Sequence, residues 1–315
     1  MTKRVKPLDL RHVTTYSLSE RKSKVRTADF AKTWQKGSAF KHFLNTLPSI
    51  LAASDLKAVI DSLATAARNQ KMVILGMGAH VIKVGLNPVI IDLMQRGIVD
   101  CVALNGAGIV HDVELAMIGH TSEDVAAAIV DGSFGMAEDT AVFLAKALAD
   151  SRPHKDGLGQ AVGRAIEEKA LPHRQLSVLA TGYRLKIPVT VHVAIGTDII
   201  HMHPQYDAAR SGEASHRDFR LLSAMVARLQ KGVYLNVGSA VILPEVFLKA
   251  ITVARNLGHQ LNDFTTVNLD FIQHYRPLIN VVDRPTASGG KGINLVGHHE
   301  IMLPLIAAGV IEQLG

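Results

Sequence analysis

The sequence is short of cysteine, of aromatic residues and of long apolar runs. Cys101 is the single cysteine among 315 residues, which excludes an internal disulfide and a multi-cysteine zinc cluster and is typical of a reducing cytoplasm. No apolar run approaches the roughly 18–20 residues needed to span a bilayer. Aromatic residues make up only 5% of the chain and form no platform for stacking on nucleic-acid bases. We therefore expect a cytoplasmic protein with neither a membrane nor a nucleic acid as its partner.

The positive charge is confined to the N-terminal segment. Residues 1–36 hold ten Lys or Arg against three Asp or Glu, an excess of +7, and since the whole chain carries +6, the other 279 residues carry −1. A basic arm on a near-neutral body lacks the broad cationic face of a nucleic-acid binder. We expect residues 1–37 to form an arm that docks on its own body or on a neighbouring subunit, and residues 38–315 to form one α/β domain.

Short apolar segments alternate with helical patterns along most of the chain. The patterns predict strands at 72–76, 99–105, 187–193, 233–238, 263–269 and 278–282. They predict helices at 39–69 with a break at Pro48, at 80–97 with a kink at Pro88, and at 108–120, 122–130, 135–149, 158–168, 216–229, 244–257 and 298–313. Strands that alternate with helices indicate βαβ units. The fold class is therefore α/β, a Rossmann-like doubly wound and mostly parallel sheet with helices on both faces.

Two consecutive strands end in glycine-rich turns, and ligands bind beyond the carboxyl ends of strands in such sheets. The first turn is Gly76-Met77-Gly78-Ala79-His80, and the second runs from Asn105-Gly106-Ala107-Gly108 to Asp112. Glycine lets backbone approach a ligand, and free N–H groups at a helix start can hold phosphate. Later strand ends add Gly196-Thr197-Asp198, Gly238-Ser239 and Thr265-Thr266. The turns predict a nucleotide-type site.

Histidines gather at the predicted strand ends and helix starts. His111 beside Asp112, His201, His203, and the His298-His299-Glu300 run are candidates for general acid–base work or for metal binding. Structural histidines are the competing interpretation. No compact zinc motif is present, and the residues that would hold a divalent metal are Asp198, His201, His203 and His299 or Glu300. The Gly-rich tract 284–292 is either a solvent loop or an anion clamp in which Lys291 reaches a phosphate.

In these turns and strands, the sequence resembles the deoxyhypusine synthase family. The resemblance is strongest in MVILGMGAHVIKVGLNPVIIDLMQRGIVDCVALNGAGIVHDVELAMIG (72–119), and it continues through 187–204, 233–258, 264–271 and the closing helix. It implies a homotetramer made of tight dimers, NAD bound between subunits, and oxidation of a polyamine whose aminobutyl group passes through an imine on a lysine. The residues that match the family's NAD site are Gly76, Ala79, Asn105, Gly106, Ala107, Gly108, Gly196, Thr197, Asp198, Gly238 and Asp270.

The departures from the family concern its catalytic residues. The Trp-Gly-Lys that carries the imine-forming lysine is replaced by Asn280-Val281-Val282-Asp283-Arg284-Pro285, and arginine cannot form that imine. Lys291 lies seven residues beyond Arg284. We therefore expect an NAD-linked enzyme that acts on an amine or a related small metabolite without the lysine-imine step. The candidate catalytic residues are His111, Asp112, His201, His298 and Lys291. A metal-assisted enzyme and a non-catalytic nucleotide-binding or assembly protein are the alternatives.

Overall fold

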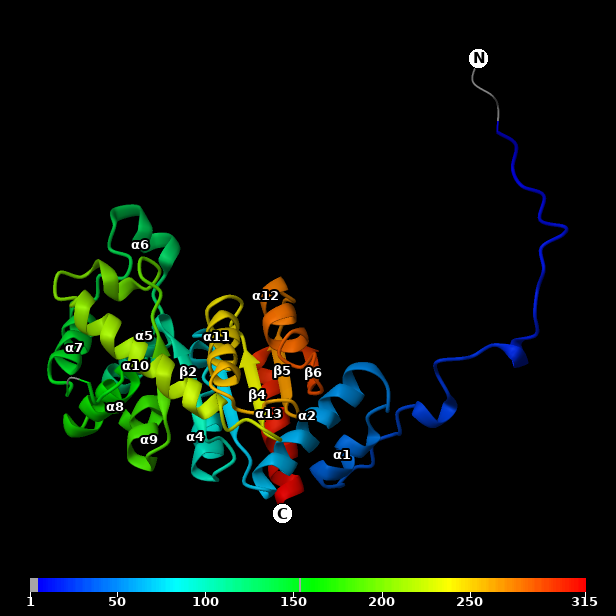
Figure 1. The fold of residues 1–315 in the computed structure, drawn as a ribbon, viewed down its shortest axis with the longest axis horizontal. Coiled ribbons are helices and arrows are strands. Elements are labelled where there is room, and N and C mark those ends of the chain that lie inside the picture. Colours follow the sequence, from blue (N-terminus) through cyan, green and yellow to red (C-terminus); the bar gives the residue numbers. More distant parts are fainter. Residues whose placement is uncertain (1–4, 153) are drawn as a thin grey trace.

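Six strands form one sheet in which all neighbouring strands are parallel (Figure 1). The computed structural model describes residues 5–152 and 154–315. The strands are β1 (Val73–Met77), β2 (Cys101–Asn105), β3 (Val189–His192), β4 (Val233–Val237), β5 (Thr265–Asp270) and β6 (Lys291–Val296), in the spatial order β3-β2-β1-β4-β5-β6. This is the strand order of dinucleotide-binding Rossmann folds. From β1 the first strands are added on one side, as β2 and β3, and the later strands on the other side, as β4, β5 and β6, so the strand order reverses between β1 and β4.

Side chains that alternate along the strands give the sheet two apolar faces. In β1, Val73, Leu75 and Met77 belong to the larger core cluster, and Ile74 belongs to the smaller one. The larger cluster is covered chiefly by α2 (Leu51–Arg68), α4 (Asn87–Gln95), α5 (Gly106–Ile118), α8 (Leu158–Glu168), α9 (Val178–Leu185) and α13 (His299–Leu314), and the smaller by α10 (Ala208–Val226) and α11 (Ile242–Asn256). Successive strand residues point to opposite faces, so near-continuous apolar strands require helices on both sides. The predicted fold class is confirmed.

The other helices are short or lie at the ends of the molecule. They are α1 (Phe40–Thr46), α3 (His80–Lys83), α6 (Val125–Asp131), α7 (Glu138–Ala149) and α12 (Tyr275–Pro277), with 3-10 turns η1 (Leu18–Glu20), η2 (Thr27–Asp29), η3 (Arg174–Leu176) and η4 (Ile199–Met202). Residues 5–28 extend away from the body (Figure 1). The segment that follows contacts the region of α1: Asp29 O accepts from Ser49 N–H at 3.0 Å, Lys32 N–H donates to Thr46 O at 2.8 Å, and Trp34 packs edge-on against Phe43. No helix among the described residues is long and apolar enough to cross a membrane.

One predicted strand is wrong, and the last strand of the sheet lies later in the chain than predicted. Residues 278–282 lie in η5 (Leu278–Asp283), a π-helical segment, and β6 begins instead at Lys291, within the tract predicted as a loop. Leu-Ile-Asn-Val-Val is a short apolar run, and periodicity alone cannot distinguish a buried strand from a buried helical turn at that length. Its Val281 packs in the smaller core cluster with the residues of α11. Helix α9 was not predicted, although Ser177 caps it by accepting a hydrogen bond from Ala180 N–H.

Candidate functional site

The strand ends at the reversal point between β1 and β4 lie in very close contact. Gly78 N–H donates to Val237 O at 2.9 Å, and a Cβ placed on Gly78 would overlap the carbonyl oxygen of Gly238. Gly238 has a φ of +66°, and its Cβ would lie 2.7 Å from Cε1 of His299. A side chain at Gly78 would push the two strand ends apart, and one at Gly238 would displace the ring of His299. Glycine is therefore required at these two positions by packing within the protein itself, independently of any ligand.

The other glycines of the two turns are also used by the chain's own neighbours. A Cβ on Gly76 would lie 2.5 Å from the Tyr234 hydroxyl, and one on Gly106 would overlap the carboxylate of Asp198. From the sequence, these glycines were predicted to allow the close approach of a cofactor. The structure shows that the close approach comes from side chains of the protein, so the glycines shape the edge of the sheet whether or not a ligand is present.

Helix α5 begins directly at the end of β2 and presents its N-terminus at this edge. The Asn105 side chain caps it by accepting a hydrogen bond from Gly108 N–H at 2.9 Å. The first N–H groups of a helix have no partner within the helix, and together with the helix dipole they favour an anion. Asp198 lies beside Gly106 and accepts from Ala194 N–H at 2.8 Å. Burial raises the pKa of Asp198, against the effect of that hydrogen bond.

A histidine-rich cluster lies at the ends of β1, β5 and β6. His80 begins α3, His298 occupies the N-cap position of α13 without a capping hydrogen bond, and Phe271 follows β5. The rings of His298 and Phe271 are stacked 5.7 Å apart, and the ring of His80 lies 6.0 Å from that of Phe271. Behind them His299 is 1% exposed, with Nε2 3.5 Å from Oδ1 of Asp270. Phe271 was not predicted as a site residue, although its place directly after a predicted strand was a signal in the sequence.

The buried His299 ring has no hydrogen-bond partner among the described residues, and its separation from Asp270 exceeds hydrogen-bond length. Burial lowers the pKa of His299, and the neighbouring Asp270 carboxylate partly offsets that effect. A neutral imidazole is therefore favoured. A buried nitrogen atom without a hydrogen-bond partner destabilises the fold. Both ring nitrogens of His299 are therefore free to form a hydrogen bond with a ligand at this edge.

Three asparagines form a ladder across β4, β5 and β6. Asn236 of β4 donates from Nδ2 to Oδ1 of Asn268 at 2.9 Å, and Asn268 donates to Oδ1 of Asn294 at 2.8 Å. Asn236 also donates to Ser239 O at 2.9 Å, which fixes the turn after β4. The three residues occupy the same register position on adjacent strands. These asparagines were not predicted as a group, because the alignment of neighbouring strands is not visible in the sequence.

The predicted residues His111 and Asp112 have different surroundings on α5. His111 Nδ1 lies 2.7 Å from Thr121 Oγ1, and that hydroxyl donates to Glu114. Asp112 is fully buried and accepts hydrogen bonds from Ser177 Oγ, Val178 N–H, Leu179 N–H and Asn87 Nδ2. Burial raises the pKa of Asp112 to about 6 despite these bonds. Asp112 therefore ties α5 to the start of α9, and its carboxylate does not face the edge of the sheet.

The remaining catalytic and metal candidates are dispersed. His201 packs edge-on against Tyr206 at 4.7 Å, and His203 Nε2 lies 2.7 Å from Gly135 O. Across residues 5–152 and 154–315, no group of three or more His, Cys, Asp or Glu side chains is placed to hold a metal ion. Lys291 is exposed and pairs with Thr265 at the amino end of β6, roughly five strand residues or about 16 Å from the carboxyl ends. This geometry does not support Lys291 at the predicted site.

No protein-family model matches the chain, and no curated protein sequence matches it. Solved structures do resemble it. The ternary complex of AgrE with ornithine and NAD+ is 15% identical with a TM-score of 0.54 and covers 84% of this chain and 34% of its own. ArgZ, a cyanobacterial arginine dihydrolase, is 13% identical with a TM-score of 0.54 and covers 82% of this chain and 32% of its own.

The chain therefore spans about a third of the length of these two neighbours. A protein from Entamoeba histolytica assigned as a deoxyhypusine synthase is 13% identical with a TM-score of 0.54, and it covers 89% of this chain and 96% of its own. Identities this low establish likeness of fold.

Proposed function

We propose that this chain is an NAD-binding enzyme that acts on an amine, polyamine-like or related small metabolite, at the carboxyl edge of the sheet between β1 and β4. The observation that carries the proposal is the strand order, which reverses between β1 and β4 and places the N-terminus of α5 at the same edge. Dinucleotides bind at such reversal points. A solved neighbour of the same fold, AgrE, holds NAD+ and ornithine.

The residues at the edge fit a dinucleotide, with two differences. The first is the carboxylate of Asp198, which lies beside Gly106 at the N-terminus of α5 and must be protonated or displaced for a diphosphate to bind there. The N-terminus of the 13-residue helix α5 suits a diphosphate, and the unpartnered ring of His299 supplies a hydrogen-bonding group. The second difference is that the end of β2 carries Asn105 in the place where many dinucleotide-binding folds have an acidic residue for the ribose. The Asn105 side chain is already engaged with Gly108. We therefore propose that other residues at the carboxyl edge of the sheet bind the ribose.

NAD supplies a hydride acceptor when it is bound, and the chain must then remove a proton from the amine. His80 and His298 are both exposed, and both rings lie beside Phe271, so either imidazole is accessible as a base. We assign the proton to His298, since its stacking on Phe271 fixes the ring. The segment 280–285, where the family's lysine belongs, falls largely within η5. We therefore propose oxidation without transfer through a lysine imine.

We also propose a homotetramer in which a second copy covers this edge. Large apolar side chains are exposed around it, namely Phe271, Ile272, Tyr275, Val296 and Ile301. An exposed apolar patch of this kind favours a protein partner. Light scattering coupled to size exclusion measures the mass directly. A monomer at all concentrations would contradict the assembly.

The decisive experiment is a calorimetric titration of NAD into the wild-type chain and into Ala107→Glu. A carboxylate at the second position of α5 favours the helix dipole, so the fold survives, but it repels a diphosphate. We expect the Kd for NAD to rise about tenfold or more, as for the loss of one charge-assisted contact. Ala209→Glu, at the second position of α10, is the matched control and should bind like the wild type. Failure of the wild type to bind NAD would overturn the proposal.

Turnover is tested by following absorbance of the reduced cofactor with a panel of diamines, polyamines and amino acids. His298→Gln should slow the reaction about a hundredfold or more, in line with the loss of a general base, without changing NAD binding. His111→Gln, away from the edge, should keep its rate. NAD binding with no turnover on any amine would identify a nucleotide-binding protein without this chemistry.

A further inference from the structure

The two outermost strands of the sheet, β3 and β6, differ in what lies beside them. At β3, Asp218 and Ser215 of α10 form hydrogen bonds with the backbone groups that point away from the sheet. At the other side the outermost strand is β6, and no helix supplies such side chains to it within the described residues. An edge strand with unpaired N–H and C=O groups can pair with another chain.

The outward backbone groups of β6 are open. Lys291 N–H donates to Phe264 O at 2.9 Å, so the odd-numbered residues of the strand face β5, and Gly292, Asn294 and Val296 direct their N–H and C=O groups away from the sheet. Across residues 5–152 and 154–315, these groups form no hydrogen bond. Gly292 and Val296 are exposed and Asn294 is partly exposed, so another chain can reach this edge.

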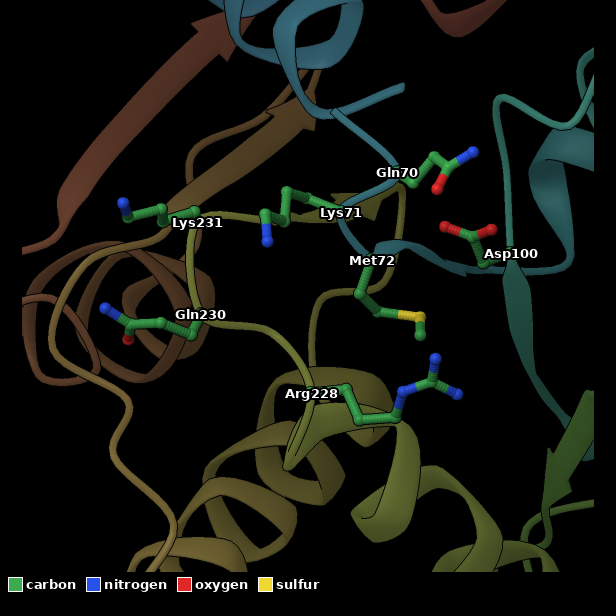
Figure 2. Close-up of a pocket in the computed structure, with 7 residues that line it drawn as sticks. All are labelled: Gln70, Lys71, Met72, Asp100, Arg228, Gln230 and Lys231. Atoms are coloured by element: carbon green, nitrogen blue, oxygen red, sulfur yellow. The ribbon is translucent and has the colours of Figure 1, made fainter. Parts of the chain in front are cut away.

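The edge at β6 also lacks the residues that usually hinder pairing, which are charged side chains and proline. β6 carries Lys291 at its first position and has neither a charge nor a proline from 292 to 296. The amino ends of β1, β2 and β4 differ in this respect. They surround a hollow of about 430 Å³, and the exposed Lys71, Arg228 and Lys231 line it (Figure 2). Charge therefore opposes association at the amino ends and does not oppose it along β6.

A side chain of β6 adds a further donor at this edge. Asn294 is the last member of the asparagine ladder, and its Oδ1 accepts from Asn268 Nδ2 at 2.8 Å. Its own Nδ2 group donates to no residue of the described chain. A carbonyl or hydroxyl oxygen of a chain placed beside β6 would receive that hydrogen bond.

The N-terminal arm contains a segment suited to this edge. Residues 13–17, Val-Thr-Thr-Tyr-Ser, are extended between a turn closed by a hydrogen bond from Val13 N–H to Leu10 O and the 3-10 turn η1. Valine, threonine and tyrosine are favoured in strands, and β1, β2 and β4 also have five residues each. Val13 is 59% exposed and Tyr16 is 69% exposed, so its own molecule covers neither side chain.

The direction of the arm favours a second copy of the chain as the owner of the paired segment. Asp29 and Lys32 hold the base of the arm against the region of α1, and residues 5–28 extend away from the body (Figure 1). In the part of the chain that the structure describes, no hydrogen bond links residues 5–28 to residues 38–315. An arm that points outward can reach the open edge of a neighbouring molecule.

We propose that residues 13–17 of a second copy add a seventh strand to the sheet, alongside β6. The backbone groups of Gly292, Asn294 and Val296 pair with the added strand, as they do where an extended peptide joins a sheet edge. Two copies exchange their arms reciprocally, which is a low-cost route to a dimer. The contact uses the side of the sheet and does not depend on the proposed NAD site.

The first test is hydrogen exchange of the full chain, resolved to single amides by mass spectrometry. The double variant Thr14→Pro/Thr15→Pro removes two adjacent N–H groups, of which one would face β6 in either register, and proline prevents pairing there. The amides of Gly292, Asn294 and Val296 should then exchange about tenfold faster than in the wild type, as expected for the loss of one hydrogen bond.

Two controls accompany this comparison. Ser23→Pro/Lys24→Pro alters the arm outside the paired segment and should exchange as the wild type does. The amides of Ile293 and Leu295 face β5 and report on the fold, so they should be unchanged in all three proteins. Equal exchange of the outward amides of β6 in the wild type and in Thr14→Pro/Thr15→Pro would overturn the proposal.

The second test identifies which copy supplies the arm. An equal mixture of nitrogen-15-labelled and unlabelled full chains is treated with a lysine-specific cross-linker. Lys22 follows the paired segment in the arm and Lys291 begins β6, so these two lysines should be joined between labelled and unlabelled chains. Lys186, exposed before β3 at the opposite side of the sheet, should give no such product with Lys22. Products of Lys22 and Lys291 within single chains alone would show that the arm docks on its own body, and would overturn the exchange between copies.

Discussion

Asp218 of α10 occupies the place beside Val191 that a seventh strand would take. Its carboxylate accepts from Val191 N–H at 2.8 Å and from Gly159 N–H at 2.9 Å, and Ser215 Oγ bridges Val191 O and Val193 N–H nearby. β3 is an edge strand of the sheet, and unpaired edge groups are open to pairing with another chain. Helix α10 satisfies the free backbone groups of β3 with its side chains and so covers this edge of the sheet.

We predict that Asp218→Ala lowers the free energy of unfolding by about 2–4 kcal/mol, because two buried N–H groups lose their acceptor. Asp218 is 1% exposed, so water cannot replace the carboxylate without a rearrangement. Urea denaturation followed by circular dichroism measures the change. Arg220→Ala on the same helix, with an exposed side chain, should change stability by less than about 0.5 kcal/mol. A similar loss in both variants would refute the role of Asp218.

The same carboxyl predicts a dependence of stability on pH. Burial raises the pKa of Asp218 from 3.8 to about 7, so between about pH 4 and pH 7 the folded protein binds more protons at this group than the unfolded chain does. Its stabilising contribution is complete below about pH 4 and is lost as the pH rises through 7. The advantage of the wild type over Asp218→Asn should shrink over this range. An advantage that is constant with pH would show that the carboxyl does not titrate there.

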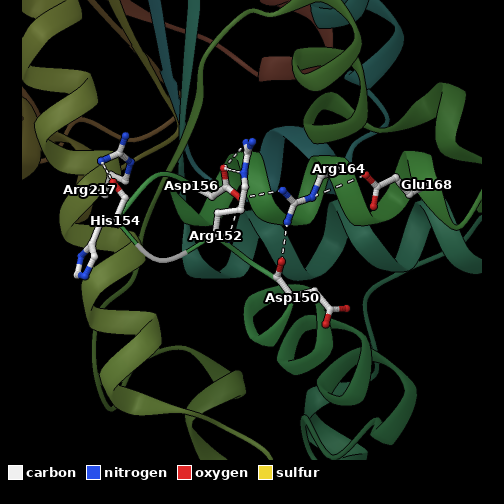
Figure 3. Close-up of polar contacts among 7 residues, drawn as sticks. All are labelled: Asp150, Arg152, His154, Asp156, Arg164, Glu168 and Arg217. Carbon is white, nitrogen blue, oxygen red and sulfur yellow. Dashed lines mark hydrogen bonds and ion pairs between the residues drawn. The ribbon is translucent and has the colours of Figure 1, made fainter.

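A second carboxylate, Asp156, should behave oppositely, because two arginines hold it ionised (Figure 3). Burial alone would raise its pKa, but Arg152 and Arg164 outweigh burial and hold the pKa below its usual value. Its contribution is therefore present at neutral pH and is lost as the pH falls through the folded pKa.

The two arginines should contribute unequally. The Arg164 side chain is 13% exposed and that of Arg152 is 58% exposed. We predict that Arg164→Met costs about 3–5 kcal/mol, as expected when one partner of a buried pair is removed, and that Arg152→Met costs about 1 kcal/mol or less. Denaturation at neutral pH compares them. Equal losses would show that exposure does not govern this pair.

The glycine packing at the reversal point predicts the effect of single methyl groups. Gly238→Ala must place a Cβ against His299 in a left-handed conformation, and we expect a loss of about 2–4 kcal/mol from overpacking and backbone strain. Gly212 lies within α10 with nothing near its Cβ position. Gly212→Ala should therefore stabilise the protein by about 0.5–1 kcal/mol. The melting temperatures of both variants measure these changes, and a stable Gly238→Ala would contradict the packing.

The sequence allowed five of the six strands and the fold class to be predicted, because each of those strands is a compact apolar run bounded by helical patterns. β6 was missed since its Lys-Gly-Ile-Asn-Leu-Val sequence is partly polar and follows glycines. The edge where strand ends converge was also predictable, because parallel strands end at a common edge.

The contacts of individual side chains could not be predicted from the sequence. His298 and His299 are adjacent in the chain, yet one is exposed and the other buried against Asp270 and Gly238. Asp112, two residues before Glu114, faces the start of α9 while Glu114 bonds with Thr121. These differences depend on helix rotation and on which segments pack beside each helix. Charge and spacing alone do not determine them.

The asparagine ladder has a consequence for the alignment of β5 and β6. A slip of two residues would keep every apolar side chain on its own face, and the hydrophobic pattern alone would hardly resist it. It would, however, set Gly292 or Val296 opposite Asn268 in place of Asn294. The Asn268 amide would then lose its acceptor, at a cost of about 1–3 kcal/mol. The ladder thus selects one alignment among those that hydrophobic packing permits.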